Sequence, residues 1–225
     1  MPLRYRRYQN NRKRNCVERR TTYDAKGRTY RRSQEIHSVQ RCIYVRGLTG
    51  YPACQHVLRI LTGIVDLIVK EVITQYSVTK VTSHSARLDV MAEDEKGKLY
   101  NIEIQRRDCV DHARRTRFYG AMIDSEFLEK GKAYEEMPDV YIIYISETDI
   151  WKAGKTKYVV EKYFSGTDMA YEDGIHILYV NAAVYDGTET AKMMEYFKYA
   201  GPDDASQGDL SRRVMLLKCE KELTI

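Results

Sequence analysis

The sequence has 225 residues, 43% of them hydrophobic and 31% charged, with a formal net charge of +5. This size and composition suit one substantial folded core, and no stretch approaches the roughly 18 apolar residues that a membrane helix needs. The arginine-rich start lacks the apolar region of a signal peptide, so we expect a cytoplasmic protein with no membrane partner.

The positive charge is concentrated at the start of the chain. Residues 1–47 sum to +11, whereas residues 48–225 sum to −6. This part of the chain has few aliphatic residues, and its apolar residues do not recur at the spacing of a helix or a strand. Residues 1–51 are therefore predicted to form a basic, disordered segment. A nucleic-acid-binding arm is the obvious functional interpretation of such a segment.

The cysteines predict neither disulfides nor a metal site. Their number is odd and no C-x-x-C pair occurs, so we interpret them as reduced thiols. Cys109 and His112 supply only half of a metal site, and no other residues complete it. The five are Cys16, Cys42, Cys54, Cys109 and Cys219.

From Pro52 onward, helical and strand patterns follow each other along one continuous chain. Apolar residues at helical spacing follow Pro52, and Gly63 is expected to end that helix. Asp66–Tyr76 is rich in β-branched residues and predicts a strand. Further strands are expected at Arg87–Glu93, Lys98–Arg106, Val140–Ile145, Tyr158–Phe164 and Ile175–Val180, and helices at Asp111–Leu128, Glu189–Tyr199 and Leu210–Leu223. The mixture predicts a single α/β domain over residues 52–225.

A tight hairpin in this pattern brings two acidic residues together. Residues 94–97 read as a reversal with Gly97 in a left-handed conformation. If Asp94 pairs with Lys98, counting outward places Asp89 directly opposite Glu103, with their β-carbons about 5 Å apart.

Strand alternation predicts which face these side chains share. Leu88 and Val90 are expected to point to one face and Asp89 to the other, where Glu103 and Gln105 also lie. Facing carboxylates repel each other unless a cation neutralises them, and a hard divalent cation prefers oxygen ligands. The pair therefore predicts an Mg²⁺ or Mn²⁺ site for phosphodiester hydrolysis. Acidic residues on a hairpin are, however, more often simply solvated.

Gln105 and four further residues are candidates for supporting contacts. The Gln105 amide can position a water or a phosphate, but it supplies no positive charge. Arg117 and Tyr119 on the following helix could contact phosphate, although such residues more often have structural roles. Arg87 is a further candidate for a phosphate contact, and Asn101 for a supporting amide.

The hairpin and the segments after it resemble a known family. Ser85-Ala-Arg-Leu-Asp-Val followed by Asp94-Glu-Lys-Gly-Lys-Leu-Tyr-Asn-Ile-Glu-Ile-Gln is similar to the signature of the PD-(D/E)XK nuclease family transposases, which are related to the recombination-promoting nucleases. The resemblance continues through Arg114-Arg-Thr-Arg-Phe-Tyr-Gly, Val140-Tyr-Ile-Ile-Tyr-Ile and Asp173-Gly-Ile-His-Ile-Leu-Tyr-Val-Asn, and it covers roughly residues 52–222.

The resemblance implies a restriction-endonuclease-like α/β fold, with a mixed central sheet flanked by helices. It also implies Mg²⁺-dependent DNA cleavage and a role in mobile-element or recombination biology. Asp89 and Glu103 take the places of the metal ligands, and Gln105 stands where many such enzymes have a catalytic lysine. The word transposase does not establish transposition, because no second catalytic domain or DNA-reading module is recognisable.

Alternatives to a nuclease remain open at this point. One is a catalytically inactive nucleic-acid-binding or interaction domain that keeps the fold, and another is a purely structural partner-binding protein. Assembly with further copies of the chain is also left open.

The two ends of the sequence depart from the family pattern. Residues 41–51 do not match the family's usual start, and a frameshift just before Pro52 would restore it. Residues 1–51 would then be an out-of-frame translation, which sequencing the gene across the junction would test. The last helix is expected to continue beyond Leu223, so we also expect a truncated C-terminus.

Overall fold

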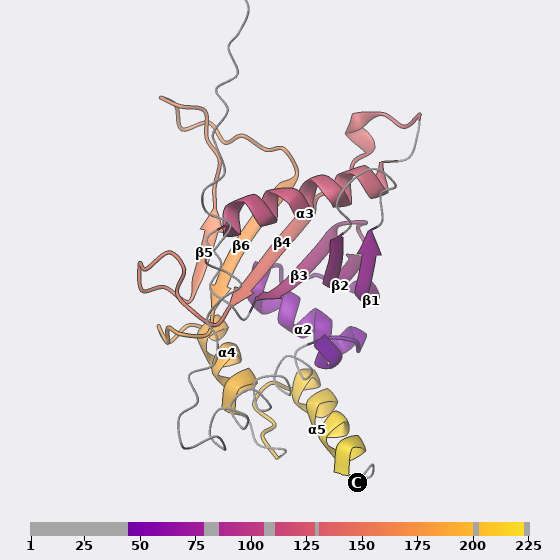
Figure 1. The fold of residues 1–225 in the computed structure, drawn as a ribbon, viewed down its shortest axis with the longest axis vertical. Coiled ribbons are helices and arrows are strands. Elements are labelled where there is room, and N and C mark those ends of the chain that lie inside the picture. Colours follow the sequence, from indigo (N-terminus) through magenta and orange to yellow (C-terminus); the bar gives the residue numbers. More distant parts are fainter. Residues whose placement is uncertain (1–44, 79–85, 106–110, 129–130, 200–202, 223–225) are drawn as a thin grey trace, which may run out of the picture. The chain divides into compact units, whose positions relative to one another are not determined.

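The structure is a computed structural model that describes residues 45–78, 86–105, 111–128, 131–199 and 203–222. Within these ranges, helices flank both faces of a six-stranded sheet (Figure 1). The predicted mixed α/β architecture is therefore confirmed. The elements are α2 (Tyr51–Thr62), β1 (Val69–Val78), β2 (Ala86–Asp94), β3 (Leu99–Gln105), α3 (His112–Phe127), η1 (Tyr134–Glu136), β4 (Val140–Ser146), β5 (Lys157–Val160), β6 (Ile175–Asn181), α4 (Glu189–Tyr199) and α5 (Asp209–Glu222).

The sheet has the strand order β1-β2-β3-β4-β6-β5. Strands β1, β2 and β3 form an antiparallel meander, β4 and β6 run parallel to β3, and β5 returns antiparallel at the far edge. The carboxyl ends of the three parallel strands β3, β4 and β6 therefore lie together at one end of the sheet, perpendicular to its edge strands. There Gln105, Ser146 and Asn181 stand level with one another.

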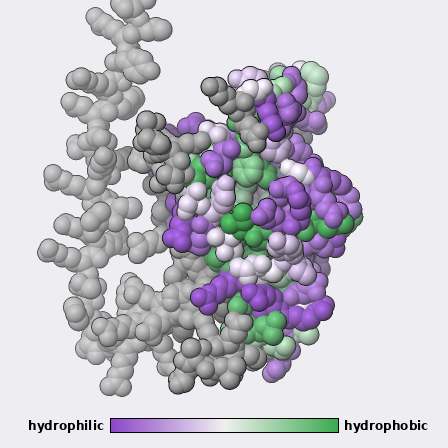
Figure 2. Space-filling view, turned by 90° about the vertical axis from the view of Figure 1, so that its right-hand side faces the viewer, coloured by the Kyte–Doolittle hydropathy of each residue, from purple (hydrophilic) through white to green (hydrophobic). Residues whose placement is uncertain are grey.

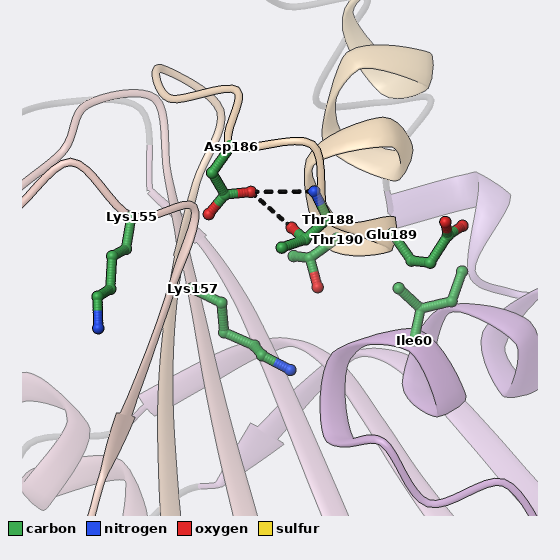
Figure 3. Close-up of a pocket in the computed structure, with 7 residues that line it drawn as sticks. All are labelled: Ile60, Lys155, Lys157, Asp186, Thr188, Glu189 and Thr190. Atoms are coloured by element: carbon green, nitrogen blue, oxygen red, sulfur yellow. Dashed lines mark hydrogen bonds between the residues drawn. The ribbon is translucent and has the colours of Figure 1, made fainter.

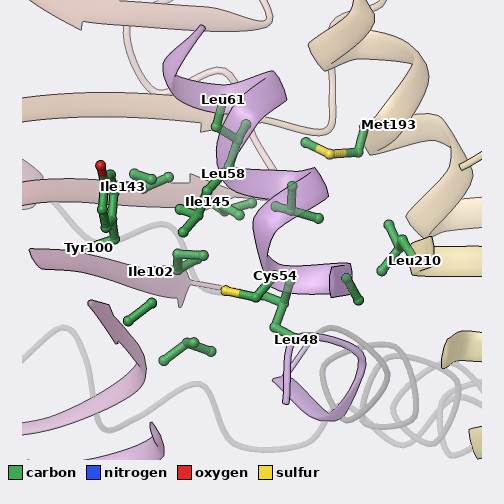
Figure 4. Packing of buried hydrophobic residues seen from close by; sticks show 14 of the residues in the cluster. Leu48, Cys54, Leu58, Leu61, Tyr100, Ile102, Ile143, Ile145, Met193 and Leu210 are labelled. Atoms are coloured by element: carbon green, nitrogen blue, oxygen red, sulfur yellow. The ribbon is translucent and has the colours of Figure 1, made fainter. Parts of the chain in front are cut away.

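Two apolar layers hold the helices to the sheet. The larger lies between the sheet and helices α2, α4 and α5, where Leu58, Ile143 and Met193 are among the buried side chains (Figure 4). The smaller lies under α3 and includes Ile123 and Ile142. Burial of both faces explains why β4 is dominated by apolar and aromatic residues from Val140 to Ile145.

Helix α3 lies close to the sheet because a glycine faces β4. A β-carbon added at Gly120 would stand 3.1 Å from Cδ1 of Ile142, which is tighter than an ordinary contact between side chains. The absence of a side chain at this position brings the axis of α3 near to the strands. Polar side chains on the same helix can therefore reach the carboxyl end of β3.

Several boundaries differ from the sequence-based expectation. Helix α2 does end where predicted, since Gly63 has φ +79° and its N–H donates to the carbonyl oxygen of Arg59. Other boundaries differ. The last predicted edge strand is shorter, because β5 ends at Val160 and only an isolated bridge between Tyr163 and Ala170 follows. Residues 45–50 precede the expected domain start, yet Leu48 is buried in the larger core. The division at residue 51 stays a prediction.

Some predicted features fall outside the described residues. These include the basic segment up to residue 44, Arg106 and Cys109. Cys54 is free and buried in the core, where burial raises the pKa of its thiol to about 12.

The surface at the β1 side of the sheet is predominantly hydrophilic, with separate small hydrophobic areas (Figure 2). An ion pair of 2.7 Å between Lys70 and Glu93 lies at this edge. Charged side chains on an edge strand hinder pairing with further strands. None of the helices in the described ranges has the length and apolar character needed to cross a membrane.

Candidate active site

The turn between β2 and β3 is organised by the side chain of Asp94. Its Oδ1 accepts hydrogen bonds from the N–H groups of Lys96 and Lys98, each at 2.9 Å, and its Oδ2 accepts one from the Tyr100 hydroxyl at 2.8 Å. The backbone N–H of Asp94 donates to the carbonyl oxygen of Lys98, and Gly97 has φ +77°. These contacts confirm the predicted reversal and fix the register of the hairpin.

The register brings Asp89 and Glu103 together. Val90 pairs with Ile102, so the next residues outward, Asp89 and Glu103, face each other. Glu103 Oε1 accepts the N–H of Asp89 at 3.1 Å, and Asp89 Oδ2 accepts the N–H of Ile104 at 3.0 Å. The two carboxylates thus accept backbone N–H groups that, in a regular sheet, would donate to backbone carbonyl oxygens. Both are nearly buried, with exposed fractions of 3% and 7%.

One expectation about this strand was wrong. Leu88 and Val90 do not share a face, because Leu88 packs in the core under α3 and Val90 packs in the core on the opposite side. The alternation of side chains is interrupted between Leu88 and Asp89. Such an irregularity changes the direction in which a strand presents its side chains.

A second irregularity lies opposite in β1, at a residue that the sequence did not single out. Gln75 lies opposite Asp89, between the pairs Thr74–Val90 and Tyr76–Leu88, and it has φ +56°. A non-glycine residue rarely adopts this left-handed conformation. Its side-chain Nε2 donates to Oδ1 of Asp89 at 3.2 Å. Backbone strain is therefore stored beside the carboxylate pair, as occurs at functional sites.

The electrostatics of the pair affect Glu103 strongly. Burial raises the pKa of its carboxyl from 4.5 to about 8, and the negative charge of Asp89 adds to the rise. The hydrogen bond from the Asp89 N–H and the charge of Arg115 act in the opposite direction. At neutral pH and without a cation, Glu103 therefore holds a proton for most of the time.

Arg115 supplies a positive charge beside Gln105. One N–H of its guanidinium donates to Oε1 of Gln105 at 3.0 Å. Tyr119 lies one turn further along α3, nearly buried, and the pKa of its hydroxyl is raised by burial and by the charge of Glu103. Arg117 is exposed on another side of the helix. Sequence reasoning selected Arg117, although a spacing of four residues before Tyr119 would have pointed to Arg115.

The remaining two candidates lie on either side of the pair. Asn101 is fully buried, and neither atom of its amide makes a hydrogen bond of standard length within the described part of the chain. It stands near enough to Glu103 to act weakly against the rise in that carboxyl's pKa. Arg87 is exposed near the start of β2, two residues before Asp89.

The residues present fit a divalent cation. Two buried carboxylates offer hard oxygen ligands, and a cation between them would offset both the burial and the repulsion that raise the Glu103 pKa. In the described ranges, no group of three or more histidine, cysteine or acidic side chains could hold a metal ion. The other ligands would have to be waters, backbone carbonyls or substrate oxygens, as is usual for Mg²⁺.

A hollow of about 350 Å³ lies elsewhere, beside the start of α4 (Figure 3). Two of its polar side chains are already used by the protein: Lys157 Nζ donates to the carbonyl oxygen of Leu61, and Asp186 accepts hydrogen bonds from Thr156 and Thr188. The hollow is lined by Ile60, Lys155, Lys157, Asp186, Thr188, Glu189 and Thr190. None of these residues belongs to the carboxylate site.

Comparison with known families decides the assignment of the chain. The sequence profile described as PD-(D/E)XK nuclease family transposase matches residues 60–200, which span both carboxylates, α3 and the rest of the sheet. The chain belongs to this family. The PD-(D/E)XK nuclease family transposases are nuclease-type proteins, which act on DNA and generally use divalent metals.

Other comparisons add little to the PD-(D/E)XK assignment. No curated protein matches this sequence. One solved structure, the refined half-complex from a tetradecameric assembly of Thermococcus gammatolerans McrB AAA+ hexamers with bound McrC, contains a chain with 11% identity and a TM-score of 0.32. The alignment covers 74% of this chain and 31% of that chain, so this chain spans about a third of its length.

Proposed function

We propose that this protein is a divalent-metal-dependent DNA endonuclease that hydrolyses phosphodiester bonds, in the setting of a mobile element or of recombination. Asp89 and Glu103 would hold the cation, which we expect to be Mg²⁺ or Mn²⁺. The observation that carries the proposal is the buried carboxylate pair itself. A nearly buried pair of acids at this position serves no apolar core, and Glu103 carries a strongly raised pKa as a result.

A bound divalent cation would supply charge stabilisation and a more acidic water for attack on phosphorus. The protein's own residues prepare the site for it. Gln75 and the N–H of Ile104 hold the two oxygens of Asp89, and the N–H of Asp89 holds one oxygen of Glu103. Fixed donors of this kind keep the ligands oriented before the substrate arrives.

In this proposal, Gln105 and Arg115 together take the role that a single lysine has in many related enzymes. Because Oε1 of Gln105 accepts from Arg115, the amide nitrogen is the end that can donate to a water or a phosphate oxygen. The Arg115 guanidinium stays charged at any working pH and lies where it can offset negative charge on the scissile phosphate.

Nicking of a supercoiled plasmid tests the proposal. The wild-type protein should convert the plasmid to nicked or linear forms with Mg²⁺ or Mn²⁺ and not with a chelator. Asp89→Asn and Glu103→Gln should abolish cleavage, whereas Glu135→Gln, which changes an exposed carboxylate on η1, should not.

Two results would contradict the assignment. Cleavage at the wild-type rate by a folded Asp89→Asn protein would remove the carboxylate pair from the chemistry. A wild-type protein that binds DNA and Mn²⁺ but cuts nothing under any metal would instead favour a catalytically inactive binding domain.

A further inference from the structure

The loop between β4 and β5, residues 147–156, follows the carboxyl end of β4 (Figure 1). The candidate active site lies at the same end of the parallel strands. Ser146, the last residue of β4, stands level with Gln105 at the end of β3. The loop therefore starts one strand away from the proposed site of cleavage. We call it the Trp151 loop after its exposed aromatic residue.

A row of side chains across the sheet links Trp151 to the carboxylates. Glu103, Tyr144 and Tyr179 occupy equivalent positions on neighbouring strands β3, β4 and β6. The Trp151 ring packs edge-on against Tyr179, with 5.2 Å between centroids and 75° between planes. Two strand spacings, or about 10 Å, separate Glu103 from Tyr179, so this buried row fixes Trp151 on the same side of the sheet as the carboxylates.

Trp151 is held in a defined position while its surface stays accessible. Asp149 accepts hydrogen bonds from the N–H groups of Lys152 and Gly154 and from the Tyr158 hydroxyl, at 2.6 to 3.0 Å. These hydrogen bonds, with the φ of +55° at Lys152, fold the loop into a compact turn. Trp151 nevertheless remains 46% exposed. A large aromatic ring that is fixed but half open to solvent is suited to stacking.

The same loop carries two lysines and two acidic residues, and one of these acids, Asp149, is engaged in the hydrogen bonds of the turn. Residues 48–225 sum to −6, yet Lys152 and Lys155 flank Trp151 and are exposed. Among the described residues, no ion pair engages either of these two lysines. The side chain of Lys155 extends away from Asp186 (Figure 3). Lys157 differs, because its Nζ donates to a backbone carbonyl.

We propose that the Trp151 loop holds the DNA strand beside the cleavage site, with Trp151 stacking on an unpaired base and Lys152 and Lys155 contacting phosphates. Aromatic rings interleaved with cations are the usual means of holding single-stranded DNA. The preferred substrate is then a duplex with a single-stranded overhang or a frayed end near the cut. This proposal rests on the proposed function, since it names the form of DNA that the same site takes.

The sequence offers a direct probe of the loop, because Trp151 is the only tryptophan in the chain. Its fluorescence can be titrated, in Ca²⁺ or a chelator to prevent cleavage, with a short duplex that carries a single-stranded overhang and with the same duplex made blunt. Quenching by the overhang substrate, and much less by the blunt one, is the expected result.

Binding of variants gives a second readout. Trp151→Ala should weaken binding of the overhang substrate about tenfold, and Trp151→Phe should restore most of the loss. Tyr134→Ala removes a still more exposed aromatic ring, on η1, and should change nothing. The melting temperature of each variant shows whether its fold is intact.

The two proposals fail in different ways. If saturating DNA leaves the fluorescence unchanged, or if the blunt duplex quenches as strongly as the overhang, the assignment of the Trp151 loop is overturned. If the fluorescence responds as expected but no metal supports cleavage, the loop assignment stands and the endonuclease assignment falls.

Discussion

Replacing Glu103 with glutamine should stabilise the metal-free protein while it destroys metal binding. The folded protein holds the Glu103 proton up to a pKa of about 8, whereas the ordinary value is 4.5. Folding therefore takes up a proton between these two pH values. The free energy of unfolding of the wild type must fall as the pH rises from 4.5 to 8, because the unfolded state binds fewer protons there.

The size of the effect follows from the pKa difference. At 1.36 kcal/mol per unit, the full difference corresponds to about 5 kcal/mol at high pH. Separation of the strands and entry of water would relieve part of this, so we expect about 2 kcal/mol at pH 8. For a chain of this length, that is a rise in melting temperature of about 6 °C for Glu103→Gln.

Glutamine is a well-matched replacement. Its Oε1 can still accept the N–H of Asp89, and its new amide protons can be accepted by the buried Asn101 oxygen, which has no standard hydrogen bond within the described residues. Glutamine does not titrate, so the stability of the variant should be nearly constant where that of the wild type declines.

Thermal unfolding from pH 5 to pH 8, with a chelator present, measures the difference. The two proteins should be alike near pH 5 and diverge as the pH rises, and Mn²⁺ should raise the melting temperature of the wild type but not of Glu103→Gln. Glu135→Gln serves as a control for loss of an exposed charge. Parallel profiles for wild type and Glu103→Gln would refute the reasoning, since a buried, repelled carboxyl cannot be indifferent to pH.

Three other changes test separate parts of the site. Asp94→Ala leaves three donors in the hairpin turn without their acceptor and should lower the free energy of unfolding by about 3 kcal/mol in urea denaturation. Gln75→Gly and Gln75→Ala both remove the amide on Asp89, but only glycine relieves the left-handed backbone, so it should be the more stable of the two by about 1 kcal/mol. Arg115→Ala should slow plasmid nicking about 100-fold, with partial recovery in Arg115→Lys; equal rates in Arg115→Ala and wild type would exclude a role for this charge.

Local rules were sufficient to predict the hairpin from the sequence. The glycine at the reversal and the acid four residues before Lys98 set a register that the structure confirms, and that register alone places Asp89 opposite Glu103. The strand and helix order follows from apolar periodicity in the same way. Such features depend on residues that are close in sequence.

What the sequence could not reveal depends on contacts between distant segments. The left-handed backbone at Gln75 has no local signal, because nothing in its neighbours demands it, and it makes sense only opposite Asp89. The interruption next to Leu88 likewise has no local signal in the sequence. The choice of Arg115 over Arg117 depends on the rotation of α3 about its axis, which is set by packing of the whole helix on the sheet.

Gly120 has a consequence for how such a protein can change over time. The guanidinium of Arg115 is carried by a helix whose closeness to the strands is permitted by one missing side chain. A bulkier residue at position 120 would move α3 away from the sheet and separate the Arg115 guanidinium from Gln105. The acidic pair, which belongs to the hairpin, would stay in place. Loss of cutting and retention of metal could thus be separated by a single apolar substitution, without any change in the polar residues by which active copies are usually recognised.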